Sequence, residues 1–149
     1  MTTQDFHSTF TVPQSPEEVF AAITNPKAWW TGDIDGATDH VGDEFTYRYG
    51  DFHFSKQKVT ELVPDQRVVW QVVESNLPGN EDPEEWTGTT ITFDITPSRG
   101  QTELRFSHHG LVPQFECFDA CSSAWGFYIN GSLKRLVTTG EGPANPPWA

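Results

Sequence analysis

The feature that most constrains the fold is a long stretch near the C-terminus, from Gln114 to Thr139. Its apolar and small side chains recur at helical spacing and fall on one stripe: Phe118, Cys121, Trp125, Ile129, Ser132, Leu133 and Leu136. We predict one amphipathic helix here, beginning near Pro113 and ended by Gly140. A helix of roughly 35–40 Å, at about 1.5 Å per residue, needs a broad surface to cover such a stripe.

The rest of the chain supplies that surface as a series of β-strands. Apolar and polar residues alternate, as in half-buried strands, over residues Asp5–Val12, Glu44–Tyr49, Phe52–Leu62, Arg67–Glu74, Trp86–Thr96 and Thr102–His108. We also expect a bulge in the Phe52–Leu62 strand and one more short strand near Ile34. A helix opens at Ser15, which forms a capping box with Glu18. An antiparallel sheet crossed by a long terminal helix is an α+β architecture.

Length and charge limit the classes of protein to consider. The chain has 149 residues, the size of one domain, and a formal net charge of −12. This acidity argues against a nucleic-acid partner or an anionic membrane surface, because both select basic patches. The N-terminus lacks the features of a signal peptide, and no apolar run is long enough to span a membrane. We therefore expect a soluble cytoplasmic protein in which Cys117 and Cys121 are free thiols.

Several local motifs sharpen this interpretation. They are SPEEVF at Ser15–Phe20, the Trp29-Trp30 pair, EWTGTTITFDI at Glu85–Ile95, TELRFSHHGL at Thr102–Leu111, and ACSSAWGFYINGSLKRLVTTGEG at Ala120–Gly142. Together they resemble the START-like (SRPBCC) superfamily, in the branch named after the activator of heat-shock protein ATPase. The resemblance implies the helix-grip fold, in which a curved antiparallel β-sheet is wrapped around a long C-terminal α-helix and encloses a cavity. We expect this single domain to cover residues 1–142, and a disordered tail at 143–149, because the end of the chain shows no periodicity.

The inward-facing aromatic residues are candidates for lining that cavity. Rings with a few polar tips suit a small hydrophobic molecule, and we expect no cofactor. The alternative is that the same rings simply fill the core. The predicted ligand-binding residues are Trp30, Phe45, Tyr47, Trp70, Trp86, Phe93, Phe106, His108, Phe118, Trp125 and Tyr128. We expect Trp30 and Trp86, together with Trp29, to lie near the rim of the cavity.

His108 precedes two cysteines, Cys117 and Cys121, and imidazole and thiolate are good zinc ligands. The spacing matches no closed zinc motif, so we expect no metal site. We instead predict a buried His108 that is hydrogen-bonded to backbone, a carboxylate or ligand, beside cysteines that act as small apolar side chains. His109 should point outward.

Two other functions remain open from the sequence. An enzyme of the cyclase or hydrolase type could draw on five possible acid–base groups, namely Tyr47, Arg48, His108, Glu116 and Tyr128, although no nucleophile elbow, phosphate loop or paired-carboxylate motif is present. A chaperone-activator-like module would instead act through its surface on a chaperone partner. The acidic loop of residues 74–85 could form a lid hinged near Pro78-Gly79.

Phe127 lies opposite the apolar stripe on the predicted helix. Gly126 and Gly131 lie beside it, which suggests either a close backbone approach or space left for another group. We expect Phe127 to be exposed and to mark a possible homodimer contact on the outer face of the helix.

Overall fold

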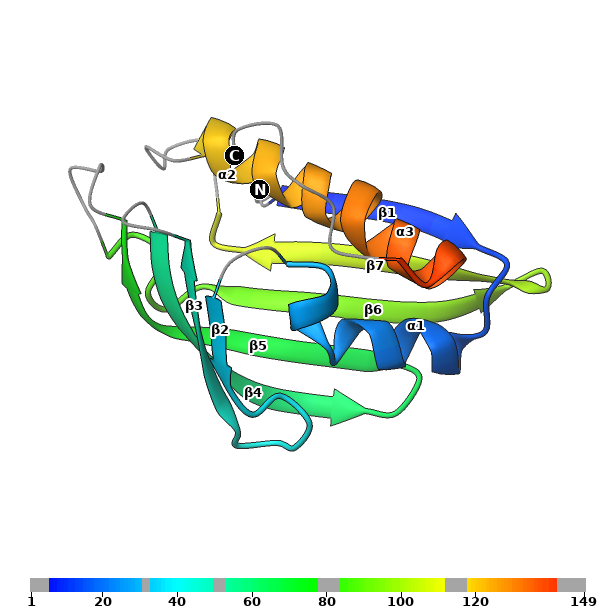
Figure 1. Cartoon of the computed structure of the whole chain (residues 1–149), viewed down its shortest axis with the longest axis horizontal. Helices are drawn as coiled ribbons and strands as arrows, with labels where there is room; N and C mark the ends of the chain where they lie inside the picture. The colour runs from blue at the N-terminus through cyan, green and yellow to red at the C-terminus, as the bar shows by residue number, and fades with distance from the viewer. Residues whose placement is uncertain (1–5, 31–32, 50–52, 78–83, 112–117, 142–149) are drawn as a thin grey trace, which may run out of the picture.

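The computed structural model describes residues 6–30, 33–49, 53–77, 84–111 and 118–141. Seven strands form one antiparallel sheet in the order β1-β7-β6-β5-β4-β3-β2. The strands are β1 (Phe6–Val12), β2 (Asp33–Gly36), β3 (Glu44–Tyr49), β4 (His53–Val63), β5 (Arg67–Asn76), β6 (Thr90–Ser98) and β7 (Gln101–His109). Figure 1 shows that the sheet curves strongly and that the helices lie on its concave face. This is the predicted helix-grip α+β fold.

The sheet also bears out finer details of the sequence pattern. The predicted short strand is β2, where Gly36 adopts φ +116 and a Cβ would meet the Glu44 carbonyl oxygen. The predicted bulge is present, because the β4–β5 register shifts at two places. One strand boundary was wrong: Trp86 lies in a turn, and β6 begins only at Thr90. Gly88, with φ +91, breaks the extended run between them.

Helix α1 (Pro16–Ile23) begins as the sequence predicts. The Ser15 side chain accepts a hydrogen bond from the Glu18 amide at 3.2 Å, and Pro16 occupies the first turn. A short 3-10 helix, η1 (Pro26–Ala28), follows and brings Trp29 back under α1, where its Nε1 donates to the Ala22 carbonyl at 3.0 Å. Trp29 is fully buried. The prediction that it lies near the rim is therefore wrong.

The C-terminal helix is not a single regular α-helix. It consists of α2 (Phe118–Gly126), a π-helical segment η2 (Phe127–Leu133) and α3 (Lys134–Thr139). Gly140, with φ +79, ends it as predicted. The wider turn brings adjacent pairs to the sheet side, so that Tyr128, Ile129, Ser132 and Leu133 are all buried. The prediction of an uninterrupted α-helical stripe is corrected at this segment.

The π-helical segment also changes the position of Phe127. Its side chain is half-buried and packs edge-on against Tyr128, with ring centroids 5.4 Å apart. The prediction that Phe127 projects into solvent alone is wrong, because the wider turn rotates it from the position that a regular helix would give it. A Cβ on Gly126 would have no neighbour within 4 Å among the described residues, so a close approach of the described backbone does not explain this glycine.

Some predictions concern residues outside the described parts of the chain, among them the 143–149 tail, the Pro78-Gly79 hinge and the state of Cys117. Cys121 is a buried free thiol. No helix within the described residues combines the length and apolar character needed to cross a membrane.

Candidate functional site

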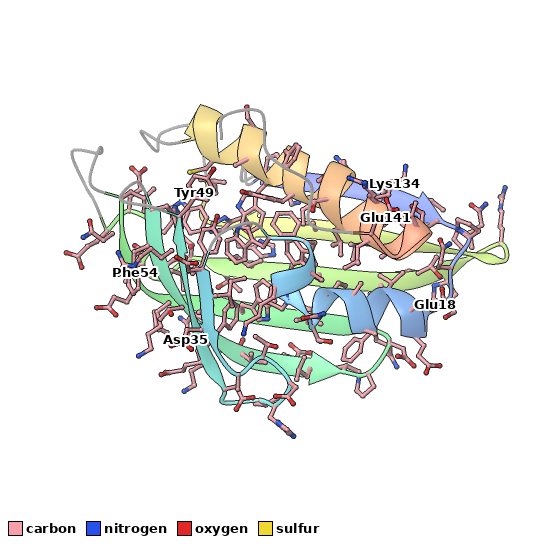
Figure 2. The ribbon with its side chains drawn as sticks, in the orientation of Figure 1. Glu18, Asp35, Tyr49, Phe54, Lys134 and Glu141 are labelled. Carbon is pink, nitrogen blue, oxygen red and sulfur yellow. The ribbon has the colours of Figure 1, made fainter. Side chains whose placement is uncertain are left out.

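The concave face is occupied by aromatic side chains from the sheet, the η1 region and the C-terminal helix. Figure 2 shows side chains filling the space between these layers. Trp30 stacks on Tyr47 with ring centroids 3.9 Å apart and lies 5.1 Å from Trp125. Trp70 meets Phe93 edge-on at 4.9 Å. Offset and edge-to-face pairs of this kind stabilise a core beyond the area that they bury.

The fold brings the predicted ligand residues together. Their side chains are buried on this face at Trp30, Phe45, Tyr47, Trp70, Trp86, Phe93, Phe106, His108, Trp125 and Tyr128. The side chain of Phe118 lies outside the described part of the structure.

His108 lies in a chain of hydrogen bonds. Its Nδ1 accepts from Nε1 of Trp125 at 3.0 Å, and its Nε2 lies 2.8 Å from the Thr89 hydroxyl. An indole N–H only donates, so Nδ1 is unprotonated and Nε2 carries the proton. The Thr89 hydroxyl then donates to the carbonyl of Trp86. His108 is thus buried, as predicted, and it is a neutral imidazole with both nitrogens engaged. The prediction of its partners was wrong, because these bonds go to the Trp125 indole and the Thr89 hydroxyl and not to backbone, a carboxylate or ligand.

This arrangement bears on the zinc alternative. A metal would need a lone pair on an imidazole nitrogen. In His108 the lone pair of Nδ1 accepts a hydrogen bond from the Trp125 indole, and Nε2 donates one to Thr89. Binding zinc at His108 would therefore require the buried Trp125 to give up its partner.

Tyr47 is a second polar tip in the aromatic interior. Burial is the main cause that raises the pKa of Tyr47 well above its ordinary value, and the charge and hydrogen bond of the neighbouring Tyr128 act in the same direction. A weaker side-chain hydrogen bond with Trp30 acts the other way. The phenol therefore stays protonated at neutral pH and offers a neutral hydroxyl.

A polar row on β4 was missed in the sequence. His53, Ser55 and Gln57 alternate along the strand and so share its inner side. Ser55 Oγ lies 3.2 Å from Nε2 of His53 and 2.5 Å from Nε2 of Gln57. Ser55 and Gln57 are fully buried. The alternation was visible, but polar residues on an inner face are hard to separate from an exposed face by pattern alone.

His53 packs between two rings of this region. Its imidazole meets Trp86 edge-on at 4.5 Å and Tyr47 at 5.3 Å. Burial lowers the pKa of His53 to about 4. At neutral pH it is therefore an uncharged hydrogen-bonding group.

This pKa predicts an acid-dependent loss of stability. In the unfolded chain a histidine titrates near pH 6.5, so between about pH 6.5 and 4 the unfolded state takes up a proton that the folded state does not. The contribution of the neutral His53 to the free energy of unfolding is therefore fully present above pH 6.5. It is lost as the pH falls through this window. Denaturant melts at pH 7 and pH 5 measure how far the free energy of unfolding drops between them. That drop should be about 2 kcal/mol smaller for His53→Gln than for wild type. His40→Gln, at an exposed histidine, is the control, and identical slopes for wild type and His53→Gln would contradict the assignment.

The interior of the described structure has no formal charge. Its buried polar residues are serine, threonine and glutamine side chains together with the neutral His108. Three buried atoms lack a hydrogen-bond partner in this interior: Oε1 of Gln57, Nε1 of Trp70 and Nε1 of Trp86. Each such group costs about 1–3 kcal/mol when it is left unpaired. The arrangement suits a neutral molecule with hydrogen-bonding atoms.

Of the five possible acid–base groups, Tyr47 and Tyr128 are buried, hydrogen-bonded neighbours, whereas Arg48 lies apart from them. Arg48 extends from the outer side of the sheet, where its guanidinium lies 4.8 Å from the ring centre of Phe54 (labelled in Figure 2). Tyr47 and His108 face inward, and both are held neutral by their surroundings. Glu116 lies outside the described residues. Among the described members of this set, the inward-facing Tyr47, Tyr128 and His108 are thus separated from the cationic Arg48.

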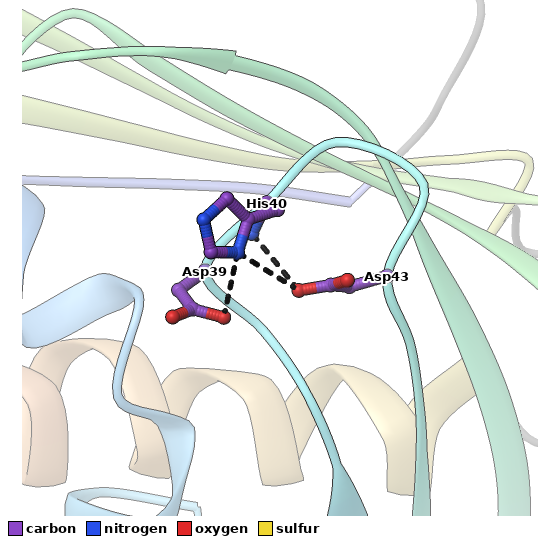
Figure 3. A group of neighbouring side chains, drawn as sticks. All are labelled: Asp39, His40 and Asp43. Atoms are coloured by element: carbon purple, nitrogen blue, oxygen red, sulfur yellow. Dashed lines mark hydrogen bonds and ion pairs between the residues drawn. The ribbon is translucent and has the colours of Figure 1, made fainter.

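A separate polar group, Asp39, His40 and Asp43, lies in the loop before β3 (Figure 3). Nδ1 of His40 is 3.3 Å from Asp39 and 3.6 Å from Asp43, and Asp43 also accepts from the His40 amide at 3.0 Å. A backbone hydrogen bond is the main cause that lowers the pKa of Asp39. Asp39 and His40 are exposed. The group closes a turn.

An open groove of about 540 Å³ lies between the start of α1, the β4–β5 turn and the end of β6. None of the predicted ligand residues lines it. The lining residues are Ser15, Pro16, Glu17, Asp65, Gln66, Ile95, Thr96 and Pro97.

Comparison with known proteins adds a family and a fold. A family model for activator of Hsp90 ATPase homolog 1-like proteins matches residues 13–138. The solution structure of the Aha1 dimer from Colwellia psychrerythraea is similar, with 30% identity and a TM-score of 0.76, over 95% of this chain and 100% of that one. A comparison with curated proteins found no match.

More distant structures share the fold alone. DynU16, from the dynemicin biosynthetic locus, has 19% identity and a TM-score of 0.67, over 94% of this chain and 49% of its own. Protein MLL2253 from Mesorhizobium loti has 20% identity and a TM-score of 0.67, over 87% and 96% of the two chains.

Proposed function

Because the chain belongs to the family of activator of Hsp90 ATPase homolog 1-like proteins, a helix-grip family, we propose that it binds a small, uncharged and largely apolar molecule. The proposed site is the concave interior between the sheet and the C-terminal helix. Binding without chemical conversion is the function that the interior supports best.

One observation carries this proposal. Within the described residues, the interior is lined by rings and carries no formal charge, yet Gln57, Trp70 and Trp86 each have a buried polar atom with no partner there. A core evolved only for packing avoids such groups, because an unpaired buried donor or acceptor destabilises the fold. A ligand with an apolar body and a few polar atoms would cover the rings and pair these atoms.

The chaperone-activator alternative has the family description and the name of the Colwellia psychrerythraea relative in its favour. Such a module needs some exposed apolar side chains, because the core of a protein interface is enriched in them. Within the described residues, Val41 and Val73 are the large hydrophobic side chains that are well exposed, and they lie on different elements. The described surface therefore favours small-molecule binding.

The proposal predicts binding of a neutral apolar fluorophore. N-phenyl-1-naphthylamine should bind the folded protein and quench its tryptophan emission. Tyr47→Trp should weaken this binding about tenfold or more, because a larger ring at this position narrows the space beside Trp30 and Trp125. Fluorescence titration measures both effects.

Thr46→Trp is the matched control, since it adds the same ring to the opposite face of β3. It should leave the affinity unchanged. Failure of wild type to bind the fluorophore would contradict the proposal, and equal binding by a folded Tyr47→Trp variant would place the site elsewhere.

We also propose that the chain self-associates, since the Colwellia psychrerythraea relative, with 30% identity over its full length, is a dimer. Phe127 is half-buried, so it cannot be the exposed anchor of that contact. Sedimentation at micromolar concentration would distinguish a dimer from a monomer.

A further inference from the structure

The structure assigns a polar subsite to the inner side of β4, formed by His53, Ser55 and Gln57 with the indole N–H of Trp86, and we propose that it binds a hydroxyl group of the ligand. This inference rests on the proposed function and adds to it the chemical group that the site selects. It concerns residues that the sequence pattern did not single out.

The hydrogen bonds among His53, Ser55 and Gln57 leave the side-chain oxygen of Gln57 without a donor. Nε2 of Gln57 donates to Ser55 Oγ, and the Ser55 hydroxyl is then free to donate to Nε2 of His53. This orientation leaves Oε1 of Gln57 as a buried acceptor with no partner. Because Gln57 is fully buried, bulk water does not compensate for the missing bond.

Trp86 supplies the matching donor. Its ring lies 4.5 Å from His53 and 4.7 Å from His108, and it stacks on Trp125 at 5.9 Å, so the indole is held from three sides. Its Nε1 is buried and unpaired. An unpaired donor and an unpaired acceptor are therefore both buried beside His53, Trp86 through ring contact and Gln57 through Ser55. A hydroxyl group is the smallest group that can accept from one and donate to the other.

The same region disfavours an anion. No cationic side chain is buried within the described residues, and the chain as a whole carries a net charge of −12. Moving a carboxylate into such an interior without a counter-charge is strongly unfavourable. The subsite should therefore select a neutral hydroxylated ligand over both its hydrocarbon analogue and its carboxylate analogue.

Three naphthalenes of similar shape test this selectivity. 2-Naphthol, 2-methylnaphthalene and 2-naphthoate differ in one substituent, and their affinities follow from displacement of N-phenyl-1-naphthylamine at pH 7. A purely apolar interior would prefer 2-methylnaphthalene, because burying an unpaired hydroxyl is costly. The subsite predicts the reverse order, with 2-naphthol at least fivefold tighter and 2-naphthoate weakest.

Two conservative variants locate the effect. Gln57→Met removes the free acceptor at similar volume, and Trp86→Phe removes the indole N–H but keeps a ring. Each should weaken 2-naphthol about tenfold, and at least fivefold more than it weakens 2-methylnaphthalene. Thr92→Val is the control, since Thr92 is buried on the outer side of β6 and away from the interior. If Gln57→Met does not fold, Trp86→Phe decides alone.

The outcomes separate the two proposals. Fluorophore binding together with a preference for 2-methylnaphthalene would overturn the subsite and leave the proposed function standing. Equal loss of both naphthalenes in the variants would also overturn it, because that result indicates altered packing. Absence of binding by the fluorophore and by every naphthalene would overturn both.

Discussion

Trp125→Ala is expected to lower the free energy of unfolding by about 3–5 kcal/mol, in the range of other large truncations in protein cores. Trp125 is 2% exposed. Its ring lies 4.7 Å from Phe106 and 5.1 Å from Trp30, and its Nε1 donates to His108. The substitution removes this packing and the hydrogen bond that Trp125 donates to Nδ1 of His108. Denaturant melts at pH 7 measure the loss.

Ser123→Ala, on the exposed side of the same helix, is the matched control and should change stability by less than about 0.5 kcal/mol. Trp125→Phe keeps a ring and deletes the N–H, so it should show an intermediate loss. A loss below about 1 kcal/mol for Trp125→Ala would mean that the helix is not anchored to the sheet at this residue.

Trp29→Ala is expected to have a similarly large effect, about 3–5 kcal/mol. Trp29 has no exposed surface. It stacks on Trp30 at 6.0 Å and on Trp70 at 6.4 Å, and its indole donates to the last turn of α1 at Ala22. The residue therefore links α1 to the centre of the sheet.

Lys27→Ala, two residues away and exposed, provides the comparison for Trp29. Chemical denaturation of both variants distinguishes the two interpretations of the tryptophan pair. If Trp29→Ala were as mild as Lys27→Ala, the residue would behave as the rim position that the sequence suggested, against the structure.

The sheet could be predicted from the sequence because its strands show period-two alternation between clear turn signals. Phe93 and Phe106 alternate with polar neighbours, and both are fully buried as expected. Helix α1 was equally clear, because the Ser15–Glu18 capping pair marks its start. These local signals agree with the fold, so pattern alone was sufficient.

The errors have a common physical cause, which is tertiary packing that local patterns do not report. The π-helical segment places both Tyr128 and Ile129 against the sheet. A regular α-helix, with 3.6 residues per turn, would direct adjacent side chains about 100° apart around its axis. Ser132 shows the consequence, since its hydroxyl donates to the Trp29 carbonyl at 2.6 Å. This contact depends on a segment far away in the chain.

The candidate site was predicted in its aromatic part only. Rings such as Tyr47 and Trp70 are recognisable as inward-facing from alternation. His53 and Gln57 look like residues of a solvent-facing strand, and only the curvature of the sheet shows that they line the interior. The pairing of β4 with β3 and the contact of Trp86 with His53 place these residues against the interior.

The central claim is that the concave interior of this chain holds a small neutral molecule. Native mass spectrometry of protein purified from its own host, without organic solvent, tests it most directly. The account predicts one defined mass increment of a small organic molecule, retained by the folded wild type and reduced in Tyr47→Trp. A spectrum that shows only the bare chain, or an increment that Tyr47→Trp retains in full, would contradict it.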